Sequence, residues 1–87
     1  MDNVSIAKLL SETADLMEIA EEDGFRIRSY RNAAGVIEGY PEQMTAILAD
    51  PSRKLTSIAG IGKGIASVIE EIVARGSFAR RDEMLER

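Results

Sequence analysis

The chain of 87 residues contains no cysteine, no histidine and no tryptophan. Without cysteine it has no disulfide and no thiolate nucleophile, and without histidine it lacks the commonest zinc ligand and general base. It has no apolar run near the roughly twenty residues of a membrane span, and the acidic Asp2 does not suit a signal peptide. Carboxylate sites stay open, but no acidic cluster has their spacing. We therefore expect a cytoplasmic chain with little equipment for catalysis.

The composition that remains is typical of a small folded domain. Hydrophobic residues make up 45% of the chain and charged residues 30%, and a chain of this length has only a modest core. We expect one domain over residues 1–87.

The charges are unevenly distributed along the chain. The net charge of −4 argues against a nucleic-acid partner, because lysine and arginine drive phosphate binding. Residues 1–23, however, carry one lysine against seven acids, whereas residues 24–69 sum to +3. This pattern allows a basic face on an acidic protein, and a solvated mixture of charges is the equally weighted alternative.

Apolar spacing predicts helices along the whole chain, so the expected fold class is all-α, a bundle of four to five short helices. Asn3 is the expected N-cap of the first helix, which should end near Asp23 and Gly24. Its predicted buried residues are Ile6, Leu10, Ala14, Met17 and Ala20. The other expected helices span residues 25–39, 41–49, 52–58, the segment from the glycine turn to Gly76, and 77–87, the last anchored by Phe78, Met84 and Leu85.

Two features of the second expected helix bear on function. Arg28 and Arg31 lie three residues apart and share a face, where they either grip phosphates or pair with acids of the first helix. Tyr30 lies in the apolar arc, which favours a core position over support of a binding pocket or stacking on an exposed base.

The sequence Gly60-Ile61-Gly62-Lys63-Gly64 is the candidate site. Glycine lets the backbone approach another surface closely, and the first amides of a helix have no partner within that helix. The positive end of the helix dipole adds to them. The turn therefore suits an anion.

Spacing separates three glycine motifs. A phosphate loop of nucleotide hydrolases needs a glycine where Ser57 stands, a serine or threonine where Gly64 stands, and a preceding strand, and none of these is present. A dinucleotide fingerprint needs a small residue where Ile65 stands, so this motif is also excluded. The helix-hairpin-helix pattern, with its core over residues 55–69, is filled at every fixed position: Leu55, Ile58, Gly60, Ile61, Gly62, Ala66 and Ile69.

The chain resembles the N-terminal domain of X-family DNA polymerases, of the bacterial type. Besides the hairpin, residues 25–34 with Tyr40 and Pro41 look like the family's second-helix segment, and Gly76 matches the glycine that ends its last hairpin helix. The resemblance implies DNA repair, sequence-independent binding of gapped or 5′-phosphorylated DNA, polymerase domains covalently linked to this one, and association with the bacterial nucleoid.

The resemblance also implies particular site residues. It assigns the turn amides to a DNA phosphate. It further implies a monovalent cation, Na⁺ or K⁺, on the backbone carbonyls of Thr56, Ile58 and Ile61. The full set of expected DNA-binding residues is Gly60, Ile61, Gly62, Lys63, Gly64, Arg26, Arg28, Tyr30, Arg31 and Lys54.

The chain departs from the family at the lyase site. Some relatives cleave abasic sites with a lysine that forms a Schiff base, and Val68 occupies the matching position. The family's pocket histidine falls at Phe25 and a pocket lysine at Gly64. We therefore expect no catalytic residue in this domain, and a lyase that uses Lys63 is the weaker alternative. A helical protein-interaction domain without DNA binding is the other alternative.

Overall fold

The computed structural model describes residues 1–76, 82 and 85–86, and all secondary structure in that part of the chain is helical. This confirms the all-α prediction. In chain order the elements are α1 (Asn3–Ile19), α2 (Gly24–Glu38), α3 (Met44–Ala49), the 3-10 turn η1 (Leu55–Ser57) and α4 (Lys63–Arg75). None of the described helices combines the length and the apolar character needed to cross a membrane.

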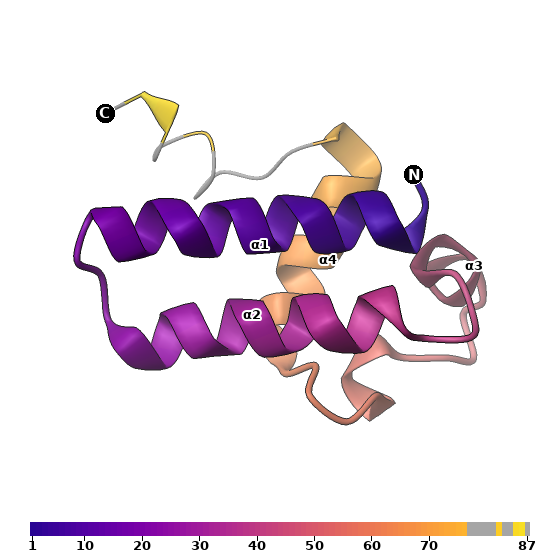
Figure 1. Ribbon diagram of the computed structural model, residues 1–87. Coiled ribbons are helices and arrows are strands. Elements are labelled where there is room, and N and C mark those ends of the chain that lie inside the picture. Colours follow the sequence, from indigo (N-terminus) through magenta and orange to yellow (C-terminus); the bar gives the residue numbers. More distant parts are fainter. Residues whose placement is uncertain (77–81, 83–84, 87) are drawn as a thin grey trace.

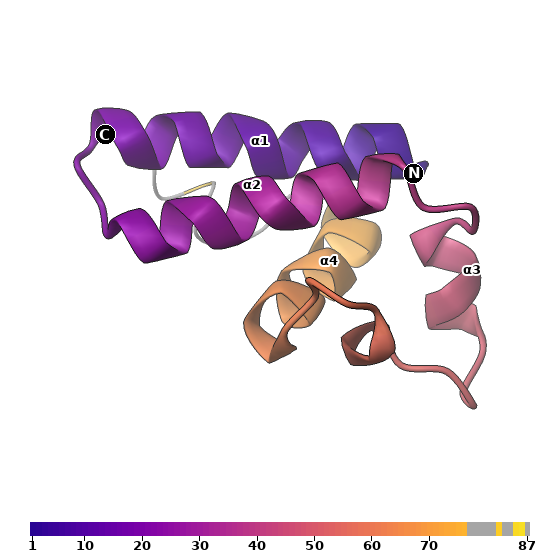
Figure 2. The same ribbon diagram turned by 60° about the horizontal axis from the view of Figure 1, so that its bottom comes forward.

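Helices α1 and α2 run antiparallel side by side and form one layer (Figure 1). The shorter elements α3 and η1 lie with α4 on one side of this pair, and α4 crosses the pair steeply (Figure 2). The glycine turn is therefore carried to the side of α2, although it follows α2 by more than twenty residues in the sequence.

The cap of α1 differs from the prediction. The N-cap is Asp2, whose carboxylate accepts a hydrogen bond from the Ser5 amide at 2.8 Å. Asn3 is buried instead, and its side-chain oxygen accepts a hydrogen bond from the Met44 amide at 2.7 Å. Its side-chain nitrogen donates to the Glu42 carbonyl at 2.7 Å. Asn3 therefore caps α3, whose own N-cap Gln43 makes no such bond.

The helix boundaries also differ from the predictions in detail. α1 ends at Ile19, four residues before Asp23, so Ala20 is exposed rather than buried. Asp23 caps α2, and its carboxylate accepts a hydrogen bond from the Phe25 amide at 3.1 Å. α3 begins only at Met44, and the helix expected over residues 52–58 is reduced to η1. There the Asp50 carboxylate accepts hydrogen bonds from Ser52, so the segment starts as a turn.

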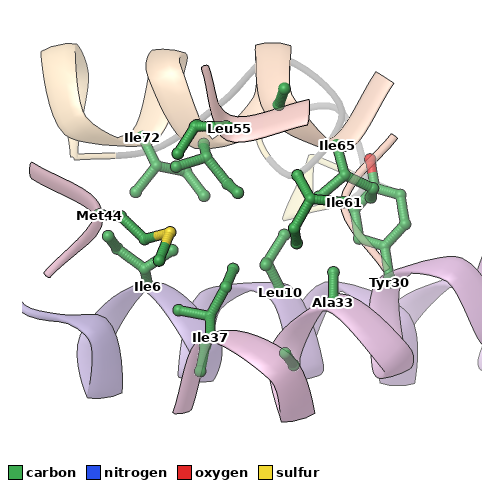
Figure 3. Packing of buried hydrophobic residues seen from close by; sticks show 14 of the residues in the cluster. Ile6, Leu10, Tyr30, Ala33, Ile37, Met44, Leu55, Ile61, Ile65 and Ile72 are labelled. Atoms are coloured by element: carbon green, nitrogen blue, oxygen red, sulfur yellow. The ribbon is translucent and has the colours of Figure 1, made fainter. Parts of the chain in front are cut away.

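The core lies where α4, η1 and α3 meet the α1–α2 pair (Figure 3). Apolar residues three or four apart on each helix face this region, as the spacing predicts. Its fully buried large side chains, Thr13 among them, include Ile6, Leu10, Met17, Ile37, Met44, Ile47, Ile69 and Ile72. The Thr13 hydroxyl donates to the Leu9 carbonyl at 2.8 Å, so this buried polar group is satisfied.

The end of α4 follows the prediction. Gly76 has φ +78°, the left-handed conformation that glycine adopts without steric cost, and its amide donates to the Ile72 carbonyl. Of the residues expected to anchor a further helix, Phe78 and Met84 lie outside the described residues. Leu85 is described and is exposed, so it does not act as an anchor.

Candidate nucleic-acid interface

The hairpin between η1 and α4 is built on two buried isoleucines. Ile58 and Ile61 are 7% and 3% exposed, and the Ile61 amide donates to the Ile58 carbonyl at 3.0 Å. Between them Gly60 has φ +93°, and a Cβ at that position would lie 3.0 Å from Val36 Cγ2 on α2. Glycine at position 60 is therefore required both by the backbone conformation and by the packing of the turn on α2.

Four amides of this hairpin are free and face solvent, whereas the amide of the buried Ile61, also an expected DNA-binding residue, is already bonded to Ile58. No described residue accepts a hydrogen bond from the amides of Gly60, Gly62, Lys63 or Gly64, and all four residues are exposed. Gly62 is the N-cap of α4, and its carbonyl already accepts the Ala66 amide at 2.9 Å. A thirteen-residue helix thus begins with unpartnered donors at the positive end of its dipole. Such an arrangement suits an anion without the help of a side chain.

A cleft of about 580 Å³ lies between the start of α2 and this hairpin. Its walls come from α2 on one side, and from the hairpin glycines and the first turns of α4 on the other. The lining residues are Asp23, Phe25, Arg26, Ser29, Tyr30, Asn32, Gly60, Gly62, Gly64, Ile65 and Val68. Two segments that the sequence analysis treated separately therefore form one site.

Three of the predicted cations are available at this end of the molecule. Arg26 lines the cleft, and Lys63 is the first residue of α4. The Arg28 guanidinium lies over the start of α2, 3.4 Å from where a Cβ on Gly24 would stand. Arg26, Arg28 and Lys63 are all exposed and form no ion pair with any carboxylate in the described part of the chain.

Arg31 lies in a different environment. Its guanidinium donates to the Asp15 carboxylate at 2.9 Å and to the Glu18 carboxylate at 2.7 Å, both on α1. The hydrogen bond to Asp15, and after it the charges of both acids, raise the pKa of Arg31. Arg31 does not line the cleft. The structure thus favours the ion-pair interpretation for this arginine and separates it from the other predicted site residues.

Lys54 also lies apart from the cleft. It is exposed and lines a smaller hollow of about 280 Å³ together with Arg53 and Thr56. Arg53 forms a bidentate ion pair with Glu42, whereas Lys54 forms no ion pair among the residues described. The structure therefore places Lys54 before η1 on the other side of the hairpin, as an isolated charge.

Tyr30 has both of the positions considered for it. The residue is 7% exposed and belongs to the core, where its ring lies near Ile61 and Ile65 (Figure 3). It also lines the cleft. Burial raises the pKa of the Tyr30 hydroxyl, while the Arg26 charge opposes that shift. Tyr30 is therefore a buried residue of the cleft lining whose hydroxyl is uncharged at neutral pH, and Arg26 is close to it.

The sequence analysis did not select the side chains that make most of the cleft wall. Phe25, Ser29 and Asn32 are spaced by four and three residues, so they share one face of α2. Ile65 and Val68 form the facing wall on α4. The available signal was the match of Phe25 and Val68 to pocket positions of the family, which had been used only to argue against a lyase.

The hydrogen bonds of the structure show whether the three carbonyl oxygens expected to hold a cation have other partners. The Thr56 and Ile61 carbonyls accept no hydrogen bond from any described residue, and the Ile58 carbonyl accepts one from Ile61. Unpartnered carbonyl oxygens beside an anion site are suitable ligands for a hard cation. These oxygens are therefore free to bind a hard cation, and the monovalent ion stays a prediction.

Comparison with known proteins identifies the family of this chain. Residues 1–78 match the model of the helix-hairpin-helix domain, and the chain belongs to this family. The chain is also similar to the "DNA polymerase/3'-5' exonuclease PolX" of Bacillus subtilis (strain 168), with 30% identity over 84 residues. The match covers 97% of this chain and 14% of that relative's length. These findings confirm the resemblance to the helix-hairpin-helix domain of bacterial X-family polymerases.

Proposed function

We propose that this domain binds the DNA backbone without sequence specificity and places one phosphate on the free amides of the hairpin. The observation that carries this proposal is the juxtaposition of unpartnered amides at the start of α4 with the unpaired Arg26 on α2. Arg26 and Lys63 supply charge on either side of the turn, and Arg28 extends it along α2. Contacts of this kind read no bases and weaken as salt concentration rises.

We further propose that the bound DNA is a duplex with a gap in one strand, and that the strand beyond the gap begins with a 5′-phosphate. A terminal phosphate carries more charge than an internal one and has fewer covalent neighbours, so it can enter a cleft that continuous duplex cannot. The similarity to PolX supports a role in DNA repair, in which this domain holds DNA for linked polymerase domains at the bacterial nucleoid. In this proposal the domain itself contributes positioning and no catalytic group.

A monovalent cation fits the same scheme. The carbonyls of Thr56, Ile58 and Ile61 would hold Na⁺ or K⁺, whose charge would favour a bound phosphate. The chain's own contribution is the turn at Gly60, because its left-handed backbone presents carbonyls and amides from the same short loop.

The lyase alternative has weak support from the geometry. Val68 lines the cleft, whereas Lys63 does not. A Schiff-base lysine must be desolvated to be partly deprotonated, and Lys63 is exposed. Borohydride trapping with abasic DNA tests this point, and a covalent adduct that is lost on Lys63→Ala would overturn the proposal of a non-catalytic domain.

The main experiment measures binding of the chain to gapped, 5′-phosphorylated DNA across a salt series. We expect affinity to fall steeply with salt and to be abolished by Gly62→Val with Lys63→Glu. A Cβ at position 62 meets nothing within 4 Å and the backbone there is extended, so the variant should fold while its side chain covers the amides. Gly35→Val is the matched control, because position 35 is equally open and does not line the cleft.

Binding that ignores salt and the double substitution would favour the rival, a protein-interaction domain. One observation gives that rival a surface to test, namely Ile19, which is 81% exposed at the end of the acidic helix α1. If DNA binding is absent and Ile19→Ala weakens a protein complex, the rival replaces the present proposal.

A further inference from the structure

The cleft is larger than a phosphate requires. A water molecule occupies about 30 Å³ in the liquid, whereas the cleft measures about 580 Å³. The amides that would hold the phosphate belong to the hairpin. The lining continues from there to Asn32 on α2 and to Val68 on α4, and the proposed function leaves that part of the cleft without an occupant.

The walls of this remaining volume have two kinds of chemistry. Phe25, Ile65 and Val68 make an apolar surface, while Ser29 and Asn32 contribute hydrogen-bonding groups. The Ser29 hydroxyl donates to the Phe25 carbonyl at 3.1 Å and keeps its oxygen lone pairs as acceptors. A flat group with apolar faces and a polar edge fits such a surface. A nucleobase has both properties, and it is connected to a phosphate through one sugar.

Phe25 is the most unusual residue of the wall. Its side chain is 70% exposed although a phenylalanine gains free energy by burial, and it stands two residues after the N-cap of α2. An exposed aromatic ring beside cationic groups is the usual stacking platform for unpaired bases. Arg26 follows it directly and lines the same cleft.

We propose that the cleft takes the whole 5′-terminal nucleotide of the phosphorylated strand, with its base unpaired and stacked on Phe25. This inference rests on the proposed function, since the hairpin amides must hold the 5′-phosphate. A base within a continuous duplex is covered on both faces by its neighbours. The base at a strand end has one neighbour fewer, so it costs less free energy to unpair. This cost is lowest when the base is mismatched. The domain therefore prefers frayed or mismatched 5′ ends over fully paired ones.

The test compares three gapped duplexes that all carry a 5′-phosphate. In the first the terminal base is paired, in the second it is mismatched, and in the third an abasic analogue replaces the terminal nucleoside. We expect the mismatched end to bind about tenfold more tightly than the abasic one, in keeping with the typical strength of base–aromatic stacking. The paired end should fall between them.

Substitution of the ring identifies the residue responsible. Phe25→Ala should remove the preference for the mismatched over the abasic end, and Phe25→Trp should retain it. Ile19→Ala is the control, because Ile19 is another highly exposed apolar residue and does not line the cleft. With 2-aminopurine as the terminal base, its fluorescence should be quenched on binding the native chain and recover with Phe25→Ala.

The outcomes separate this inference from the proposed function. Equal affinity for mismatched and abasic ends, with binding still dependent on the 5′-phosphate, overturns the inference and leaves the function standing. Loss of dependence on both phosphate and salt overturns the two together. A preference for the mismatched end that survives Phe25→Ala contradicts the stacking role of this ring.

Discussion

Arginines of the same helix have opposite surroundings in this protein. Arg31 on α2 is held by Asp15 and Glu18 of α1, while Arg26 and Arg28 near the start of α2 form no ion pair with a described carboxylate. α1 ends at Ile19, and its last acids lie beside the middle of α2. The start of α2 instead faces the cleft and the hairpin. Net charge is therefore a poor guide to nucleic-acid binding, because what counts is which cations the acids neutralise.

Charge reversal at the start of α2 should have the largest effect. Arg26→Glu with Arg28→Glu should weaken binding to gapped DNA about a hundredfold at low salt, because attractive phosphate contacts become repulsive. Fluorescence anisotropy across a salt series measures this loss, together with a smaller salt dependence.

The counterpart is Arg31→Glu, which should change DNA affinity less than twofold because that arginine already serves two carboxylates. An equal loss in both variants would show that α2 acts as one uniform basic face, and the comparison would fail.

The glycines of the hairpin should divide in the same way between folding and binding. Gly60→Ala should lower the free energy of unfolding by about 1–2 kcal/mol, since φ +93° is a left-handed conformation and the new Cβ meets Val36. Gly62→Ala should leave stability nearly unchanged, because its backbone is extended and open.

Chemical denaturation of both variants measures this difference. Equal destabilisation at positions 60 and 62 would contradict the division of roles within the turn.

Release of Arg31 from its acidic partners should increase DNA affinity. In the variant with Asp15→Asn and Glu18→Gln, the guanidinium loses both charged partners and becomes available to DNA. We expect a gain of affinity of about threefold and a salt slope steeper by about one phosphate contact. The same substitutions combined with Arg31→Gln provide the control, and a gain that persists there would come from lost acidity of α1 rather than from Arg31.

The smallest effect should come from the ion pair between Glu42 and Arg53. The hydrogen bond from Arg53 and its charge lower the pKa of Glu42. A carboxyl whose pKa is lower in the folded state contributes stability above its unfolded pKa, and this contribution is lost as pH falls toward the folded value. Arg53→Met should therefore reduce stability slightly at neutral pH and not at strongly acidic pH, as measured by thermal melts.

DNA affinity should not change in Arg53→Met, because Arg53 is already paired and lies outside the cleft. A strong loss of affinity would move the interface to the other side of the hairpin.

Single residues show where a local sequence signal predicts the structure correctly and where it does not. The helical spacing of Ile6, Leu10, Ile37 and Ile69 identified core residues correctly. A helix of regular pitch places residues three or four apart on one face, and here that face is buried. Asn3 misled the prediction, since an asparagine before an apolar run is as good an N-cap signal as Asp2. Only the position of α3 shows that the Asn3 side chain bonds a distant amide.

Local periodicity was enough to predict the long helices and most of the core, and the glycines at positions 60 and 62 were enough to predict a turn without side chains. Which charges remain available, and what the turn faces, follow only from the packing of segments that are distant in the sequence. Arg26 and Arg31 carry the same group five residues apart on one helix, and only the approach of α1 pairs one of them. The cleft likewise exists only because α4 brings Val68 to the same cleft as Phe25, and no local pattern encodes the meeting of residues more than forty positions apart.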